Sequence, residues 1–66
     1  MKIQLNGKEL QIDSGTTLIQ LINNEGMTGK RLAAEVNREI ITKAEHPNHI
    51  LKDGDIVEIV HAIGGG

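Results

Sequence analysis

The feature that most constrains the fold of this 66-residue chain is the dipeptide Asn6-Gly7, which lies between two short runs of alternating apolar and polar residues. Asn-Gly favours a type I′ turn, because both central residues of that turn need a positive φ. A two-residue turn also sets the register of the flanking strands and places Ile3 opposite Leu10. The apolar side chains then share one face, so the turn and the hydrophobic pattern predict the same β-hairpin.

A short amphipathic helix is predicted after the hairpin. Thr17 and, three residues later, Gln20 form a capping box, in which each side chain satisfies a backbone N–H of the other residue. The apolar residues that follow have i, i+3, i+4 spacing and share one helix face: Leu18, Leu21 and Ile22. Gly26 ends the helix after about two turns, since glycine is the usual residue just past a helix C-terminus.

Three further strands are predicted in the second half of the chain. Residues 32–36 and 39–42 form two short strands joined by a turn. Residues 43–55 are irregular, because Pro47 prevents a regular helix or a central strand there. Residues 56–63 are rich in β-branched side chains and apolar on both faces, which is typical of the central strand of a sheet.

Together these elements predict an α+β domain of the β-grasp, or ubiquitin-like, class: a mixed sheet of four to five strands packed on one helix. The hairpin needs a layer over its apolar face, and the helix is the only element that supplies one. The last strand is free to run parallel to the first. We expect residues 1–63 to form this domain and residues 64–66 to form a flexible glycine tail. The expected core residues are Ile3, Leu10, Ile12, Leu18, Leu21, Ile22, Val36, Val57 and Ile59.

The composition excludes several classes of function. The chain has no Cys for disulfides, iron–sulfur clusters or thiol catalysis, and no aromatic ring to stack on bases or cofactors. Its formal net charge of −2 argues against nucleic-acid binding. Without a membrane-spanning segment or the apolar region of a signal peptide, a cytoplasmic location is expected. So small a domain has little room for a catalytic pocket, which favours a carrier or binding module over an enzyme.

The chain ends in three glycines, which directly follow the last predicted strand: Ile63-Gly64-Gly65-Gly66. Glycine has no Cβ, so such a tail can pass through a narrow channel with almost any φ and ψ. Three extended residues span about 10 Å, enough to carry a terminal carboxylate beyond the domain. The pattern suggests that the Gly66 carboxylate is delivered into the active site of another protein. The alternative is a frayed end or a cloning remnant without a role.

Further motifs accompany this tail: a turn at residues 52–55 with the sequence Lys-Asp-Gly-Asp, and the segments Val36–Ile41 and Val57–Val60. With the Asn-Gly hairpin, the β-grasp order and the short length, they resemble the ubiquitin-like sulfur carriers over the whole chain. Within that superfamily the resemblance is to the family that serves thiamine biosynthesis. The chain departs from the family pattern at Thr42-Lys43, where the family often carries Pro and Arg.

The resemblance implies a reaction at Gly66. An ATP-dependent adenylyltransferase similar to the ubiquitin-activating enzymes would convert the Gly66 carboxylate to an acyl-adenylate. Sulfur that comes from cysteine through a desulfurase would then replace AMP and form a thiocarboxylate, which thiazole synthase would consume. ATP and Mg²⁺ belong to the activating partner, because this chain has no glycine-rich phosphate loop that opens a helix. The carrier itself is then expected to need no cofactor.

The last predicted strand also suggests a docking surface beside the tail. If Val57 and Ile59 face the helix, the alternate residues face away from it, and no segment remains to cover them. The residues expected to contact a partner are Glu58, Val60, Ala62 and Ile63, with Gly64 and Gly65 in the partner's channel. Residues 34–66 hold six acidic and three basic side chains, which would steer this half towards a basic partner. The alternative is ordinary exposed apolar surface.

No catalytic or metal site is predicted. His46 and His49 lie three residues apart on an irregular segment, and two imidazoles without a third ligand indicate a solvated loop. His61 lies among apolar residues near the tail and is expected to pack or to contact a partner, because no second catalytic group is evident.

Two other functions stay open at this point. The same fold and tail would suit a sulfur carrier for molybdopterin or another pathway, or a modifier that is conjugated to lysines. A β-grasp module could also bind a partner without any chemistry at its tail.

Overall fold

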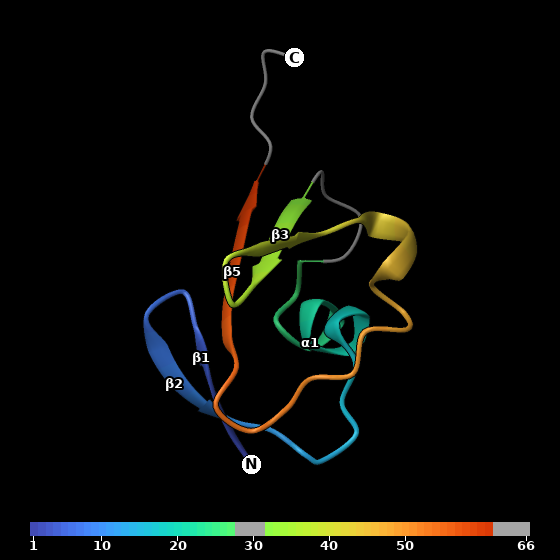
Figure 1. Ribbon diagram of the computed structural model, residues 1–66. Helices are drawn as coiled ribbons and strands as arrows, with labels where there is room; N and C mark the ends of the chain where they lie inside the picture. The colour runs from blue at the N-terminus through green and yellow to red at the C-terminus, as the bar shows by residue number, and fades with distance from the viewer. Residues whose placement is uncertain (28–31, 62–66) are drawn as a thin grey trace.

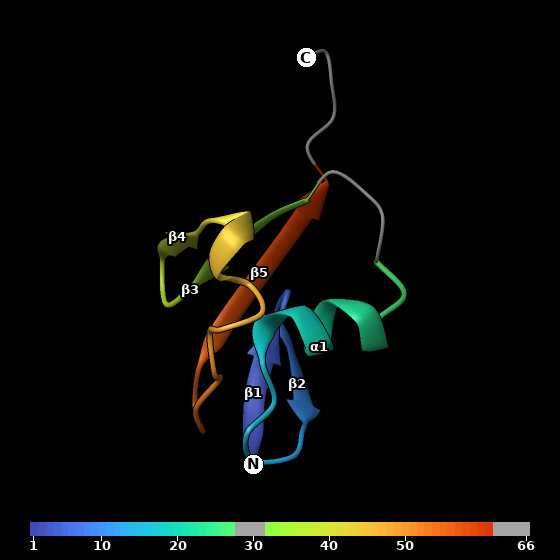
Figure 2. The ribbon, with the colours of Figure 1, turned by 90° about the vertical axis from the view of Figure 1, so that its right-hand side faces the viewer.

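Five strands form one mixed sheet, and the helix α1 packs on one of its faces (Figures 1 and 2). The computed structural model describes residues 1–27 and 32–61. Within them, the elements are β1 (Lys2–Leu5), β2 (Lys8–Gln11), α1 (Leu18–Asn24), β3 (Leu32–Val36), β4 (Glu39–Ile41), the 3-10 helix η1 (Lys43–Glu45) and β5 (Ile56–His61). The strand order β2-β1-β5-β3-β4 is that of a β-grasp domain, so the predicted fold class is confirmed.

The strand β5 is the centre of the sheet. It pairs in parallel with β1, where Leu5 is opposite Val57, and antiparallel with β3, where Ala34 is opposite Ile59. Its inward side chains, Val57 and Ile59, are buried. The sequence predicts this central position, and it leaves the last strand free to run parallel to the first, as the structure shows.

Two tight turns with positive φ at both central residues connect the outer strands. Asn6 and Gly7 have φ of 49° and 86°, as a type I′ turn requires, and the expected pairing of Ile3 with Leu10 is present. The same kind of turn joins β3 to β4, with φ of 52° at Asn37 and 72° at Arg38. The second turn is notable because arginine lacks glycine's tolerance of the left-handed region.

The capping box at the start of α1 has the predicted form. The Gln20 backbone N–H donates to Thr17 Oγ1 at 3.3 Å, and the Thr17 backbone N–H donates to Gln20 Oε1 at 2.9 Å. Two more N–H groups of the first turn, at Leu18 and Ile19, donate to the carbonyls of His49 and His46. The loop that follows η1 therefore completes the cap of the helix, which anchors it to the first half of the chain.

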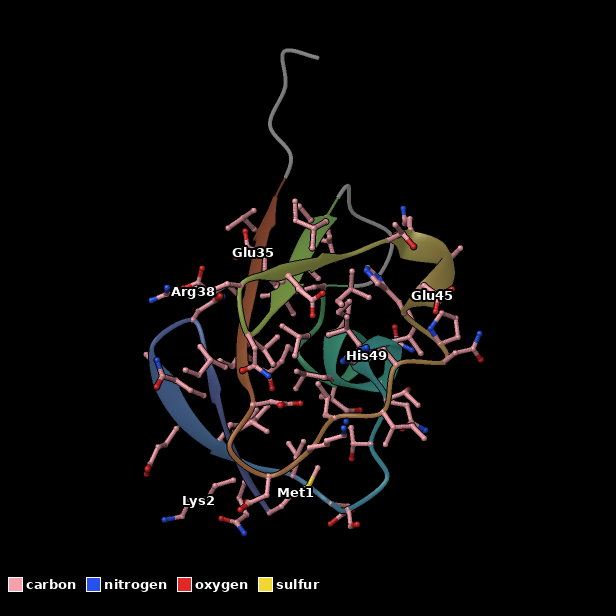
Figure 3. The ribbon with its side chains drawn as sticks, viewed as in Figure 1. Met1, Lys2, Glu35, Arg38, Glu45 and His49 are labelled. Carbon is pink, nitrogen blue, oxygen red and sulfur yellow. The ribbon has the colours of Figure 1, made fainter. Side chains whose placement is uncertain are left out.

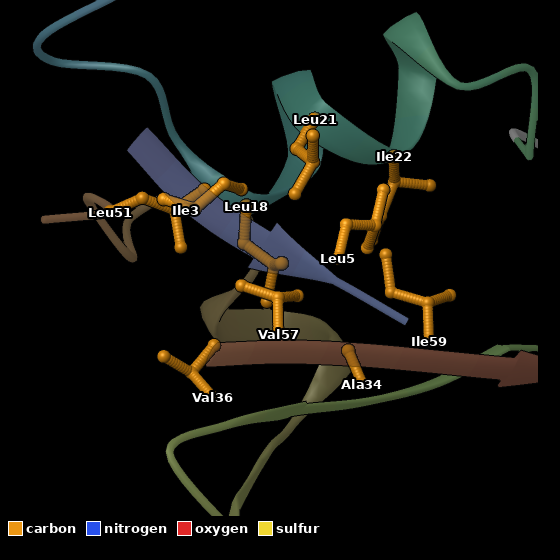
Figure 4. Close-up of a cluster of buried hydrophobic side chains, with 10 residues drawn as sticks. All are labelled: Ile3, Leu5, Leu18, Leu21, Ile22, Ala34, Val36, Leu51, Val57 and Ile59. Carbon is orange, nitrogen blue, oxygen red and sulfur yellow. The ribbon is translucent and has the colours of Figure 1, made fainter. Parts of the chain in front are cut away.

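The core lies between α1 and the sheet (Figure 4). Its buried side chains are Ile3, Leu5, Leu18, Leu21, Ile22, Ala34, Val36, Leu51, Val57 and Ile59. Seven of the nine predicted core residues are among them. Leu10 and Ile12 are only half-buried, because β2 is an edge strand and α1 is too short to cover it. Leu51 joins the core from the loop, where the sequence predicts no element at all.

The segment 43–55 contains more structure than predicted. Lys43–Glu45 form one turn of 3-10 helix, and the preceding strand ends at Ile41 rather than at Thr42. The expectation of a solvated loop is wrong for His46, whose side chain is 2% exposed. Its Nε2 lies 3.0 Å from the Ile41 carbonyl oxygen, so the ring bonds the end of β4 to the loop.

Candidate functional site

The face of the sheet opposite α1 carries several exposed apolar side chains. On β5, Ile56 is 47% and Val60 58% exposed, and on the edge strand β4, Ile40 is 73% exposed. Ala33, directly opposite Val60 on β3, is exposed as well. Exposed β-branched side chains gathered on one sheet face are typical of a surface that binds another protein. We refer to these residues, together with Glu35 and Glu58, as the open face.

Two carboxylates lie in the middle of the open face. Glu35 of β3 is directly opposite Glu58 of β5 in the antiparallel register, so their side chains project from the same side of the sheet. A shallow hollow lies beside them, and its lining residues are Glu35, Asn37, Arg38, Ile56 and Glu58. Glu35 and Arg38 both project on the side of the sheet away from α1 (Figure 3). The lining of the hollow therefore combines one apolar side chain, Ile56, with charged side chains of both signs.

Arg38 occupies this position at the expense of backbone strain. Its φ of 72° lies in the left-handed region, which costs a residue with a Cβ about 1–2 kcal/mol relative to the right-handed region. Strained residues are often retained where the side chain has a role in binding or catalysis. Arginine is also among the residues that contribute most to protein interfaces. Arg38 is therefore a candidate binding residue that the sequence alone does not reveal.

The predicted docking residues divide into two groups. Glu58 and Val60 lie on the open face and are exposed, as their alternation with Val57 and Ile59 predicts. Ala62 and Ile63, and the tail residues Gly64, Gly65 and Gly66, lie outside the described residues, and their roles stay predictions. The described part of β5 ends at His61, so the open face leads directly to the segment that carries the tail.

Ile40 and Ile56 belong to the open face but are not among the docking residues that the sequence predicts. A signal for Ile40 exists in its neighbours, because Glu39-Ile40-Ile41 must place one isoleucine on each side of a strand. Ile56 lies two residues before Glu58, and Val60 lies two residues after it. The same alternation therefore places both side chains on the side of Glu58. The strand order is needed only to show that Ile40 and Ile56 lie on one surface.

The described residues contain no group of three His, Asp or Glu side chains placed to hold a metal ion. His49 is half-buried, and His46 is held in the loop by the Ile41 carbonyl. No helix in the described part of the chain is long and apolar enough to cross a membrane.

The model of the ThiS family matches residues 3–66 of the chain. The sulfur carrier protein ThiS of Bacillus subtilis is 40% identical over 65 residues, which cover 97% of this chain and 98% of that protein. The thiazole synthase of Magnetococcus marinus is 36% identical over 66 residues, and the chain spans 20% of its length. A crystal structure of the thiamine biosynthesis protein ThiS from Geobacter metallireducens superposes with a TM-score of 0.86 at 26% identity, over the whole of both chains.

Proposed function

Because the chain belongs to the ThiS family of sulfur carriers, we propose that it carries sulfur as a thiocarboxylate on Gly66 and donates it for thiazole formation in thiamine biosynthesis. The observation that carries the proposal is the match to the family over residues 3–66, which includes the three glycines. Two relatives are named thiazole synthase, and the chain spans about one fifth of their length. This association favours thiazole formation over molybdopterin synthesis or conjugation to lysines.

The proposed reaction at Gly66 begins with activation, because a carboxylate is a poor electrophile. A carboxylate oxygen attacks the α-phosphorus of ATP, and pyrophosphate leaves with the electrons of the broken P–O bond. The product is a mixed anhydride of Gly66 and AMP. The terminal sulfur of a persulfide, which the desulfurase forms from cysteine, then attacks the Gly66 carbonyl carbon, and AMP leaves with the electrons of the C–O bond. The product is an acyl disulfide. A thiol reductant then attacks the sulfur of the persulfide-bearing cysteine, which breaks the S–S bond, forms a new disulfide and releases the Gly66 thiocarboxylate. ATP and Mg²⁺ are bound by the activating enzyme, and the carrier supplies only the carboxylate.

The open face gives this chain a means of docking on its partners. Apolar burial of Val60, Ile56 and Ile40 would supply affinity, while the charged residues of the hollow would select the orientation. We propose that the first partner is an adenylyltransferase of the ubiquitin-activating type and that thiazole synthase receives the sulfur. Docking through β5 would aim the following tail at the partner's reaction centre. Because the reaction consumes ATP, we propose that it takes place in the cytoplasm.

The direct test is to incubate the purified chain with the adenylyltransferase of its own organism, ATP, Mg²⁺, cysteine, a cysteine desulfurase and a thiol reductant. Intact mass spectrometry should show the gain that replacing one oxygen by sulfur produces, and fragmentation should place it on Gly66. A parallel reaction without ATP should leave the mass unchanged. Absence of the thiocarboxylate in the complete reaction, with a known carrier converted alongside, would contradict the proposal.

A further inference from the structure

The side chain of Asn6 pairs with β5 as a strand backbone would. The Asn6 backbone N–H donates to the Val57 carbonyl at 2.9 Å, which continues the parallel pairing of β1 with β5. The side chain forms the next two hydrogen bonds along β5: Asn6 Oδ1 accepts from the Ile59 N–H at 2.8 Å, and Asn6 Nδ2 donates to the Ile59 carbonyl at 3.2 Å. One amide therefore supplies both the acceptor and the donor that a paired peptide would offer.

This arrangement follows from where the hairpin turns. The backbone of β1 leaves the sheet at the Asn6-Gly7 turn, so its paired positions with β5 stop at Leu5 and Val57. Ile59 lies two residues further along β5, on the same edge, where β1 no longer reaches it. Among the described residues, the Asn6 amide is the group that bonds the Ile59 peptide on this edge.

A second asparagine makes a similar contact at the other end of β5. Asn37, in the β3–β4 turn, accepts from the Ile56 N–H through Oδ1 at 2.9 Å, and its own backbone N–H donates to the Ile56 carbonyl at 2.7 Å. Its Nδ2 donates to Asp55 Oδ1 at 2.9 Å. The two asparagines share positive φ and amide bonding to the β5 segment, but only Asn6 acts near the end from which the tail leaves.

We propose that Asn6 is a positioning residue for the sulfur-transfer reaction, and that its amide holds the tail-bearing end of β5 in the direction that partners require. The inference rests on the proposed function of the tail. Without the amide, the Ile59 peptide loses its bonds on one edge, and within the described residues β5 is paired from Ile59 to His61 with β3 alone. The strand end then has to be ordered when the carrier docks, and that entropy cost weakens productive binding.

The experiment compares two substitutions that remove an amide without adding strain. Asn6→Gly keeps a residue that tolerates positive φ, so the hairpin turn can still form. The control, Gln20→Ala, removes the side-chain amide that accepts from the Thr17 N–H at the start of α1, away from the open face, and alanine is favoured in a helix. Steady-state adenylation is measured by pyrophosphate exchange with the cognate adenylyltransferase, at a temperature where circular dichroism shows every variant folded. Asn6→Gly should raise the KM for the carrier by about fivefold, which corresponds to about 1 kcal/mol, with kcat nearly unchanged. Gln20→Ala should leave KM within about twofold of the wild type, although both variants lose stability.

A second readout separates this inference from the function on which it rests. Amide hydrogen exchange in the free carrier should become faster at Ile59 in Asn6→Gly and at Thr17 in Gln20→Ala. Equal KM values for the two variants, or a wild-type KM for Asn6→Gly, would overturn the positioning role. Unchanged exchange at Ile59 in Asn6→Gly would show that the Asn6 side-chain amide does not hold the Ile59 peptide. If the wild-type carrier accepted no AMP, the proposed function would fail instead, whatever the exchange data showed.

Discussion

Glu35 and Glu58 face each other directly across the β3–β5 pair on the uncovered side of the sheet. Like charges at such positions destabilise a sheet, and nothing in the fold of the described residues requires both to be acidic. We therefore expect the pair to face a cationic side chain of a partner.

Replacing one carboxylate should stabilise the protein and weaken docking. Glu58→Gln should raise the free energy of unfolding by about 0.2–1 kcal/mol, measured by urea denaturation, because it removes the repulsion from Glu35. Glu9→Gln on β2 is the matched control, since Glu9 is exposed and lies opposite the uncharged Gln4. An equal gain in both variants would mean that net charge, rather than the facing pair, is responsible.

Because the backbone of Arg38 is strained, replacing this residue should likewise raise stability and weaken binding. Arg38→Gly converts the β3–β4 turn to Asn-Gly and should raise the free energy of unfolding by up to about 1 kcal/mol, because relief of strain outweighs the added entropy of glycine. The same variant should bind the adenylyltransferase more weakly in a calorimetric titration, since it removes the guanidinium from the hollow. Unchanged affinity would remove Arg38 from the interface, and a loss of stability would contradict the strain assigned to its backbone.

The role of the open face in docking can be tested with two variants, each of which places one negative charge at an equally exposed position. Val60 and Ile50 are 58% and 57% exposed, but Ile50 lies in the loop beside Thr17 rather than on the open face. Val60→Asp should leave the melting temperature near that of the wild type and weaken binding to the adenylyltransferase by tenfold or more, a loss of at least about 1.4 kcal/mol. Ile50→Asp should bind normally. Equal effects of the two substitutions would show that docking does not depend on the open face.

The sequence predicts the elements of this fold that depend on local signals. The Asn6-Gly7 turn sets the hairpin register without help from the rest of the chain, and the capping box from Thr17 to Gln20 sets the start of α1. Alternation in β5 is sufficient to assign Val60 to the open side. Each of these features is specified by residues within a few positions of one another.

Features that depend on distant contacts were missed. Leu51 and His46 lie in a segment without periodicity, and their burial arises because the loop carbonyls cap α1 and draw the loop onto the core. Asp55 is buried because its carboxylate accepts from Asn37 Nδ2 and from the Lys52 N–H, a network that no local pattern announces. The contacts of Asn6 with Ile59 join residues more than 50 positions apart, so the turn was predicted but its second role was not.

His46 should contribute to stability rather than to chemistry. The Ile41 carbonyl can only accept, so His46 Nε2 carries the proton of their hydrogen bond. His46→Ala should lower the free energy of unfolding by about 1–3 kcal/mol, because it leaves that carbonyl without its partner. His49→Ala, at a half-buried side chain, should cost clearly less. The opposite ranking in urea denaturation would contradict the structural role assigned to His46.

In the proposed reaction, the Gly66 carboxylate is the group that accepts AMP and then sulfur. Deletion of Gly66 tests this role in ATP–pyrophosphate exchange with the cognate adenylyltransferase, followed by intact mass spectrometry for the thiocarboxylate. A terminal glycine has no side chain to bury, so stability should hardly change, but the new carboxylate stops about 3.5 Å short of the reaction centre. We predict exchange and thiocarboxylate formation in the wild type and neither in the deletion variant; exchange and sulfur transfer at the wild-type rate after the deletion would contradict the account.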